Sequence, residues 1–414
     1  GRVGGKVGGH KQLAAVCNVV SQNRCFCVGQ VGPGRIDEHR SGIRIKLIGV
    51  PYDDLLAQLN LIGPHFTYDM IRIDVAQFGD IGQSIYRPLD ELSISPEGLS
   101  PRLIKNGYDS YSMLNGRVYA LPLDPSVQIF LYRTDLFHDA KLCRAYYERF
   151  HENLVVPTTY EQYLHAAEFF TRSCNPDSPT EYGTTMTCGS ASVAASDFLP
   201  FYLSRIDRFG STPETLRLDC PEMQAAMRQY HALENFSCKQ NWWGDSIQKF
   251  AEGKTAMTVI YSNYAAELIN SGNSVVVGRV GAAILPGCKP LLGGGIVGIS
   301  RYSQKAEACK QFFHWYYSAD VASLLVRLGG TSPIVDAYED FQNYSIFPWM
   351  NTSKKSFGLG QRGVINQTPE RFSIPKYEFA VGTAVRSVVQ DLMTPEDASR
   401  MAQALYDAAD PVCR

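Results

Sequence analysis

The chain has 414 residues, of which 45% are hydrophobic and 19% are charged, as in a globular protein with two or three compact units of about 150 residues each. The formal net charge is −2 and no lysine- or arginine-rich run stands out, which argues against a surface for nucleic acid or anionic membranes. No run reaches the ~18 consecutive apolar residues that a membrane-spanning helix needs.

The eleven cysteines are an odd number at irregular spacings, so at least one is unpaired within a monomer. We expect most of them to be small buried side chains, and one or two disulfides stay open as an alternative. A metal cluster is disfavoured because Cys25-Phe26-Cys27 is the only close pair in the sequence. We therefore expect neither a metal nor a cofactor.

Residues 1–42 are rich in glycine and valine, and only 26–31 is a candidate strand. The stretch from Leu13 to Cys17 faintly resembles a lipoprotein cleavage box. However, Val16 is not the small residue expected before the cysteine, and 3–10 is too polar and glycine-rich for the apolar core of a signal peptide. We expect no export signal in this segment, and a signal upstream of residue 1 stays open.

From Ile43 onward the pattern indicates alternating strands and helices. Residues 43–48 alternate apolar and polar side chains and predict a strand, 55–59 predict a helix, and 68–75 predict a second strand. This alternation is typical of an α/β fold with parallel strands, in which ligands bind beyond the carboxyl ends of the strands. It therefore places 74–77 at a cleft.

The stretch from Asn115 to Phe137 is the segment around which we expect the chain to be organised. Two apolar runs, 118–121 and 127–132, predict two strands separated by prolines. Asp124 and Ser126 lie between these runs. The pattern predicts a crossover that carries the chain from one lobe to another and leaves these polar groups facing a cleft.

Residues 157–256 predict a helical layer. Thr158 to Glu161 form a capping-box pattern in which the Glu161 carboxylate would bond back to the chain. Trp242 and Trp243 fall in a polar loop, and 256–261 predict a strand that returns the chain to the first lobe. Further helices are expected from Pro221, over 304–317 and from Pro395.

The sequence carries no pattern that indicates catalysis. It lacks the histidine, serine and phosphate-loop motifs of common enzymes. Gly293-x-Gly295-x-x-Gly298 matches a dinucleotide pattern by letters, but 296–299 continue as a strand instead of opening a helix. We interpret these glycines as a turn that allows the close approach of a ligand or of backbone, and we expect no catalytic residue.

Several side chains suit a sugar, which has an apolar ring face and a rim of hydroxyls. One of the two tryptophans can stack on the ring, the alternative being that it packs in the core. Asp74, Gln77 and Asp124 are candidate acceptors for hydroxyls. Each alone is more often a cap or a surface charge, but all three fall at strand ends or at a crossover.

Five blocks carry a family resemblance over about residues 43–336: 68–75, 88–92, 115–137, 250–257 and 329–333. In these blocks the chain resembles the extracellular solute-binding proteins, family 1, of sugar-type ABC transporters. The resemblance implies an α/β, two-lobed, type II periplasmic-binding-protein-like fold. Each lobe would be a mixed sheet flanked by helices, joined to the other by crossover strands near Asp124, Met257 and Leu325.

The same resemblance implies a division of the chain and a set of site residues. We expect 1–42 as an unassigned segment, 43–123 plus 258–325 as the first lobe, and 124–257 plus 326–414 as the second. The turn after the strand 256–261 would face the ligand. The predicted ligand-binding residues are Asp74, Gln77, Asp124, Ser126, Trp242, Trp243, Tyr261, Asn263, Gly295 and Ser332.

The function implied is that of a solute-binding protein that captures a carbohydrate and serves as the substrate-binding component of an ABC importer. Its partners would be the sugar and the permease subunits, with no nucleic acid, in a monomer located outside the cell or in the periplasm. Lipid anchoring through an upstream segment stays open.

Two other functions stay open. The same lobes serve as the sugar-sensing part of a cytoplasmic transcriptional regulator, and an upstream helix-turn-helix would indicate that role. A glycosidase would need two carboxylates about 5–10 Å apart across the cleft, for which Asp74 and Asp124 are the candidate pair.

Overall fold

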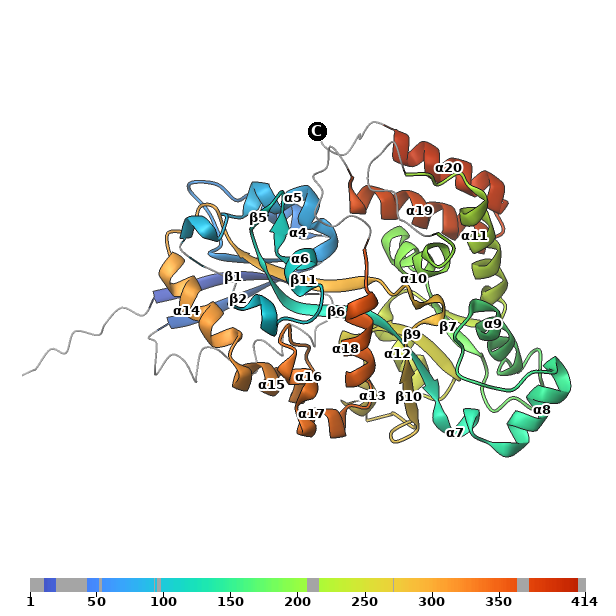
Figure 1. Ribbon diagram of the computed structural model, residues 1–414. Coiled ribbons are helices and arrows are strands. Elements are labelled where there is room, and N and C mark those ends of the chain that lie inside the picture. The colour runs from blue at the N-terminus through green and yellow to red at the C-terminus, as the bar shows by residue number, and fades with distance from the viewer. Residues whose placement is uncertain are drawn as a thin grey trace, which may run out of the picture.

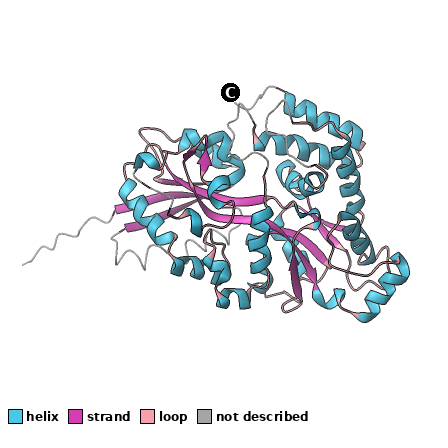
Figure 2. Cartoon of the chain, viewed as in Figure 1, coloured by secondary structure: helices cyan, strands magenta, loops and turns pink. Residues whose placement is uncertain are grey.

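The computed structural model describes residues 11–19, 43–51, 54–92, 94, 98–206, 216–270, 272–362 and 372–408. Strands run through the middle of the molecule and helices cover them on the outside (Figure 2). The candidate strand at 26–31 lies outside the described residues. Among the helices of the described part, none is long and apolar enough to cross a bilayer.

The first lobe is built on five strands in the order β2-β1-β3-β11-β6. Strands β1 (Lys11–Val19), β2 (Ile43–Pro51) and β3 (Met70–Asp74) are parallel, and β11 (Leu292–Ile299) is antiparallel to both β3 and β6. The strands predicted at 43–48 and 68–75 are confirmed as β2 and β3. β1 lies in the segment left unassigned, and it contains the stretch from Leu13 to Cys17.

Short helices follow these strands, and longer ones pack outside them. The helix predicted at 55–59 is confirmed as α4, and that at 304–317 as α14. The helices of this part of the chain are α4 (Leu55–Leu59), α5 (Phe78–Ile85), α6 (Gly107–Tyr111), α14 (Ala306–Tyr316) and α15 (Ala319–Arg327). The small hairpin of β4 (Met113–Leu114) and β5 (Arg117–Val118) precedes β6.

β6 (Leu121–Arg133) is a single long strand that belongs to both lobes (Figure 1). Its first half pairs with β11, and its second half pairs with β9 (Met257–Tyr261) and β10 (Val280–Ala283). The predicted crossover is therefore confirmed. The prediction of two strands broken by prolines is wrong, since one strand runs through both of them.

The prolines are tolerated because β11 and two tyrosines adapt to them. The pairing of β6 with β11 shifts by one residue between Gly295 and Ile296, and Gly294 takes a positive φ of 82° that glycine allows. The hydroxyls of Tyr316 and Tyr317 donate to the carbonyls of Leu123 and Pro122, over 2.5 and 2.6 Å. Proline removes an N–H donor from the ladder, and the two tyrosine hydroxyls satisfy carbonyl acceptors of β6 in the same irregular stretch.

The second lobe adds strands β7 (Thr184–Thr187) and β8 (Ser237–Gln240), which are parallel. A parallel bridge between Tyr182 and Thr255 joins this pair to the start of β9. The strand predicted at 256–261 exists as β9, but it does not return the chain to the first lobe. β9 and β10 both pair with the second half of β6, and β11 makes the return. The lobe boundaries at 123, 257 and 325 stay a prediction.

Helices enclose the second lobe and close the chain. They are α7 (Thr134–Phe137), α8 (Ala140–Phe150), α9 (Tyr160–Phe169), α10 (Ala191–Leu203), α11 (Pro221–Glu234), α12 (Trp243–Ala251), α13 (Glu267–Asn270), α19 (Ile374–Val389) and α20 (Pro395–Asp407). The helices predicted from Pro221 and Pro395 are confirmed. Between the lobes run α16 (Asp336–Glu339), α17 (Phe341–Ile346) and α18 (Met350–Leu359), of which α18 packs against β6.

The helix α9 begins with a capping box, but not with the predicted partner. The Thr159 hydroxyl accepts from the backbone N–H of Gln162 over 3.2 Å. The Gln162 side chain reaches back and accepts from the backbone N–H of Thr158 over 2.9 Å. Gln162 is the third helical residue, the position from which a side chain can reach the cap, whereas Glu161 is the second.

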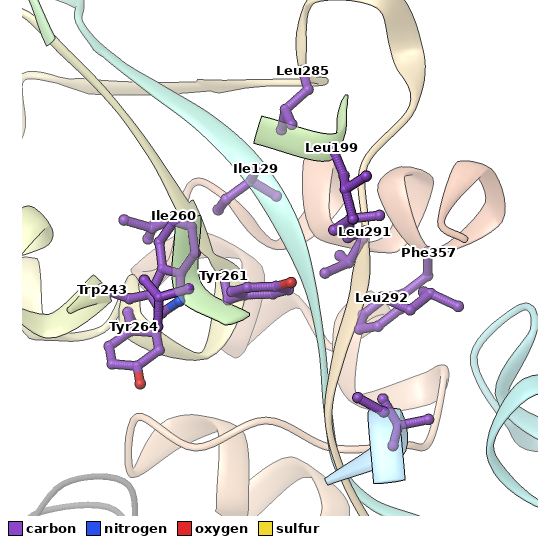
Figure 3. Close-up of a cluster of buried hydrophobic side chains, with 14 of the residues drawn as sticks. Ile129, Leu199, Trp243, Ile260, Tyr261, Tyr264, Leu285, Leu291, Leu292 and Phe357 are labelled. Atoms are coloured by element: carbon purple, nitrogen blue, oxygen red, sulfur yellow. The ribbon is translucent and has the colours of Figure 1, made fainter. Parts of the chain in front are cut away.

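A buried apolar cluster fills the junction where β6, β9 and β11 meet (Figure 3). Ile129, Leu291 and Leu292 come from the crossing strands and the residue before β11, and Phe357 comes from α18. Free thiols are carried by Cys143, Cys174, Cys188, Cys220, Cys238, Cys288 and Cys309, of which Cys309 is buried and Cys288 exposed. The expectation of buried cysteines thus holds for Cys309 and not for Cys288.

Candidate functional site

Strands of both lobes end where β6 and β11 cross between the lobes. β3 ends at Asp74, and the turn η2 (Val75–Gln77) that follows it packs against α19. β9 ends at Tyr261, whose ring packs against Gly293 of β11. The next residue, Ser262, accepts a hydrogen bond from the backbone N–H of Val127 over 3.3 Å. Carboxyl ends of strands are the expected ligand-binding edge of an α/β sheet.

A contact between the lobes lies beside these strand ends. The hydroxyl of Ser373, at the start of α19, donates to the carboxylate of Asp80 in α5 over 2.7 Å. α19 packs mainly on α10 and α20 of the second lobe, whereas α5 follows β3 of the first. The lobes are thus in direct contact at this edge.

Asp74, Gly295 and Asp124 form one row across three strands. Gly295 of β11 pairs with Asp74 of β3 on one side and with Asp124 of β6 on the other. Arg72 is two residues before Asp74 and therefore shares its face of the sheet. The Arg72 guanidinium donates to both carboxylate oxygens of Asp124, over 3.0 and 2.7 Å.

The missing side chain of Gly295 allows this arginine bridge. A Cβ at position 295 would collide with the guanidinium of Arg72, which lies directly over the glycine. Arg72 thereby spans from β3 over β11 to Asp124 in β6. The sequence indicated that a glycine here admits a close approach, and the group that approaches is an arginine of the same chain.

A second arginine, Arg362, joins four elements beside the crossing strands. Its guanidinium donates to both carboxylate oxygens of Glu378 in α19, over 2.9 and 3.1 Å. It also donates to the hydroxyl of Tyr261 over 3.0 Å and to the carbonyl of Leu292 over 2.9 Å. A weaker bond of 3.4 Å reaches the hydroxyl of Ser196 in α10. The Arg362 and Glu378 side chains are both buried.

The charge of Asp74 contributes to the electrostatics of this network. Burial raises the pKa of Tyr261 to about 12, and the Arg362 charge opposes the shift. Burial also raises the pKa of the Glu378 carboxyl above its usual range, opposed by Arg362 and assisted by the negative charge of Asp74. Glu378 and Asp74 in turn favour the charged form of Arg362 and outweigh its burial, so its pKa is raised.

The two tryptophans occupy different environments. Trp243 is the first residue of α12 rather than part of a loop, and it is only 3% exposed. Its ring packs edge-on against Tyr261 at a centroid distance of 5.2 Å (Figure 3). Trp242, the residue before the helix, is half-buried, and its indole N–H donates to the Tyr264 hydroxyl over 2.6 Å. Of the two, Trp242 is the one with an accessible surface.

Two predicted side chains carry buried oxygen atoms that lack a hydrogen-bond partner in the described structure. They are Gln77 Oε1, in the turn after β3, and Asn263 Oδ1, in the turn η5 (Ser262–Tyr264) after β9. By contrast, Asp74 Oδ1 accepts from the backbone N–H of Ala76 over 2.9 Å, which makes Asp74 a cap.

The remaining predicted residues are buried. Ser126 lies in β6 opposite Gly293 and is 1% exposed. Ser332 is also 1% exposed, and its hydroxyl accepts from the backbone N–H of Ile334 over 3.1 Å. The residue before it, Thr331, lines a cavity of about 20 Å³, a size that holds one water molecule. The walls of that cavity include Ser262, Gly330, Thr331 and Trp349.

Four residues that organise this region were not predicted from the sequence: Arg72, Tyr111, Arg362 and Glu378. Tyr111 donates to the carbonyl of Gly293 over 2.8 Å and so holds β11. Two signals were available, since Arg72 is a charge within an apolar strand and Glu378 falls on the apolar face of α19. Arg362 gave no signal.

Within the described ranges, no group of three or more His, Cys, Asp or Glu side chains is placed to hold a metal ion. The arrangement is therefore one of hydrogen-bonding groups and an aromatic surface between two lobes. Such a site can hold a polar guest by contacts alone.

Solved structures with this architecture cover nearly the whole chain. An ABC transporter solute-binding protein from Agrobacterium radiobacter K84, in complex with ribitol, is 20% identical with a TM-score of 0.77, covering 95% of this chain and 97% of that one. The GacH receptor of Streptomyces glaucescens GLA.O, studied unliganded and with acarbose, is 16% identical with a TM-score of 0.75. The match covers 96% of this chain and 98% of the receptor. Maltose-bound MalE3 of T. maritima is 18% identical with a TM-score of 0.72, and the match covers 95% of this chain and 98% of MalE3.

These likenesses confirm the two-lobed α/β fold. A family model described as bacterial extracellular solute-binding protein also matches residues 37–349, well over half of the chain. The chain therefore belongs to the bacterial extracellular solute-binding protein family.

Proposed function

We propose that this protein captures a carbohydrate between its lobes, as the substrate-binding component of an ABC importer. The observation that carries the proposal is the meeting of strand ends from both lobes, Asp74 at the end of β3 and Tyr261 at the end of β9, beside a buried polar network. Hydroxyl-rich guests suit such a surface, since each hydroxyl both donates and accepts. The ribitol, acarbose and maltose bound by similar structures support the same class of ligand.

The ten predicted residues divide into two groups in this proposal. Asp74, Gln77, Asn263 and Trp242 would touch the guest, because they offer oxygen atoms or an accessible aromatic surface at the strand ends. The others would shape the site through their own partners, namely Asp124, Ser126, Trp243, Tyr261, Gly295 and Ser332.

Binding would proceed by closure of the lobes around the guest. β6 and β11 cross between the lobes and are the natural hinge, and contacts such as Ser373 to Asp80 close the edge. A guest that touches both lobes stabilises the closed form and shifts the population toward it. A hydroxyl left unpaired in the closed site would cost ~1–3 kcal/mol, which gives selectivity without chemistry.

The guest would leave unaltered, and the protein would deliver it to permease subunits outside the cell or in the periplasm, as a monomer. Membership in an extracellular family supports this role over that of a cytoplasmic regulator. A glycosidase role is disfavoured because Arg72 holds both oxygens of Asp124, which leaves that carboxylate unsuited to exchange protons. Turnover of any glycoside would overturn this part of the proposal.

A thermal-shift screen across mono- and oligosaccharides and sugar alcohols tests the proposal, since a ligand that binds only the folded state raises the melting temperature. We expect at least one sugar to raise it, and Trp242→Ala to reduce that rise. Trp315→Ala is the matched control, because Trp315 lies on α14 in the outer layer of the first lobe. No shift with any sugar would contradict the proposal.

A further inference from the structure

In the described part of the chain, the two lobes are joined at three crossings that lie side by side. β6 and β11 are two of these crossings, and Val127 of β6 pairs with Leu292 of β11. The third is the segment 360–362, which lies between α18 and α19. Its Gln361 carbonyl accepts from the backbone N–H of Leu292 over 3.0 Å, so all three crossings meet at one level of the structure.

Arg362 fastens the second and third crossings to the second lobe. Its guanidinium has five N–H donors, and each of them has an acceptor: two in Glu378, and one each in Tyr261, Ser196 and the carbonyl of Leu292. The Arg362 side chain is only 9% exposed. Because no donor of this arginine is left for a guest, its contribution to the site goes through the elements that it joins.

Two polar side chains fasten β6 to the same lobe. The hydroxyl of Ser262, just after β9, accepts from the backbone N–H of Val127 over 3.3 Å. The side-chain amide of Gln128 donates to the carbonyl of Ser196 in α10 over 2.7 Å and accepts from the backbone N–H of Leu291 over 2.9 Å. β6 is therefore held by the second lobe from Val127 onward.

The first lobe holds the neighbouring residue of each crossing. Tyr111 of α6 is fully buried, and its hydroxyl donates to the carbonyl of Gly293 over 2.8 Å and more weakly to that of Ser126 over 3.3 Å. Asn106, just before α6, donates to two carbonyls at the end of α18, the second that of Gly360, over 2.8 and 3.4 Å. The contacts of the first lobe thus end one residue away from those of the second.

We propose that Arg362 and Tyr111 are positioning residues for guest capture, which fasten the crossings to the second and the first lobe and confine the rotation between the lobes to three residue pairs. The pairs are 126–127, 292–293 and 360–361. Two of these pairs contain a glycine, which tolerates a change of backbone torsion. The inference rests on the proposed function, because it says how the lobes turn around that guest.

The loss of an anchor has two expected consequences. The crossing that it held would flex over more residues, so the amides around the three pairs would exchange faster with solvent. A guest that closes the lobes would then have to order those residues, so it would bind more weakly although none of its own contacts has changed.

The first measurement is hydrogen–deuterium exchange, followed by mass spectrometry, on the sugar-free full chain. Tyr111→Phe removes the hydroxyl and keeps the ring, and Arg362→Lys keeps the charge but cannot reach five acceptors. In either variant, we expect exchange in the peptides that cover the three pairs to rise at least about fivefold, with little change in the rest of each lobe.

Tyr86→Phe and Arg133→Lys are the matched controls. Tyr86 is a buried tyrosine of the first lobe whose hydroxyl donates to the carbonyl of Ile71 over 2.9 Å. Arg133, at the far end of β6, is buried and donates to both carboxylate oxygens of Asp135, over 2.7 and 2.6 Å. Each control removes the same kind of hydrogen bond away from the crossings, so exchange at the three pairs should not change.

The second measurement is calorimetry with maltose and ribitol, which similar structures bind. Tyr111→Phe and Arg362→Lys should weaken the binding of a probe that wild type binds by at least about threefold, and the controls should leave it unchanged. If Arg362→Lys does not fold, Tyr111→Phe decides.

The outcomes separate this inference from the proposed function. Unchanged exchange at the three pairs, or an equal rise in all protected peptides, overturns the anchoring. Faster exchange at the pairs with unchanged affinity overturns the positioning role in capture. Absence of binding of both probes to wild type counts against carbohydrate capture, and the exchange result alone then decides whether Arg362 and Tyr111 anchor the crossings.

Discussion

Replacing Gly295 with alanine tests the arginine bridge between β3 and β6. The new methyl group would occupy the position of the Arg72 guanidinium and push it away from Asp124. The φ of Gly295 is not positive, so the backbone itself accepts alanine. Any loss of stability should therefore come from the displaced ion pair.

The expected magnitude follows from the burial of the two partners. Breaking a fully buried pair costs about 3–5 kcal/mol, and an exposed pair contributes about 0–1 kcal/mol. Here the arginine is 7% exposed and the aspartate 36% exposed, which places the loss between these limits, at about 2–3 kcal/mol. Alanine is better than glycine in a strand by about 0.5–1 kcal/mol, so we expect a net loss of about 1–2 kcal/mol.

The assay is urea unfolding followed by circular dichroism and tryptophan fluorescence, with agreement of the two probes as the check on two-state behaviour. In an Arg72→Ala background, Gly295→Ala should be neutral or slightly stabilising, because no guanidinium remains to be displaced. Gly63→Ala is the control, since a Cβ at position 63 meets no atom within 4 Å. An equal loss in both backgrounds would refute the bridge as the cause.

Three further experiments have expected outcomes. Burial raises the pKa of Asp197 to about 7, so the folded state holds a proton that the unfolded state releases near pH 4. The free energy of unfolding therefore falls as the pH rises between these two values. Asp197→Asn should raise the melting temperature at pH 8 more than at pH 5, and an equal rise at both pH values would contradict this. Trp242→Phe keeps an aromatic ring but loses the indole N–H, so it should retain more of a sugar-induced thermal shift than Trp242→Ala does. Gln162→Ala should cost about 0.5–1.5 kcal/mol in urea unfolding and Glu161→Ala less than about 0.5 kcal/mol, because the Gln162 side chain, and not that of Glu161, bonds back to the Thr158 backbone N–H before α9.

Some residues of the candidate site could be predicted from the sequence, and their hydrogen-bond partners could not. Asp74 and Tyr261 were placed at strand ends by local pattern and by family resemblance, and the structure puts them there. The partners that tune them were not found, because Arg362 is separated from Tyr261 by 101 residues and comes from a segment without periodicity. A pattern along one strand or helix cannot report which distant side chain will lie beside it.

The sequence by itself determined that strands and helices alternate from Ile43 onward, that β6 crosses between lobes, and that the family blocks stand in order. These features depend on hydrophobic periodicity and on turn residues, which act over a few neighbours in the chain. Only the tertiary structure decided that β6 continues through Pro122 and Pro125, that β9 stays with the second half of β6, and that Arg72 covers Gly295. Each of these depends on a partner far away in sequence: the shifted register of β11, the tyrosines Tyr316 and Tyr317 at the end of α14, and a guanidinium that fits only where a side chain is missing.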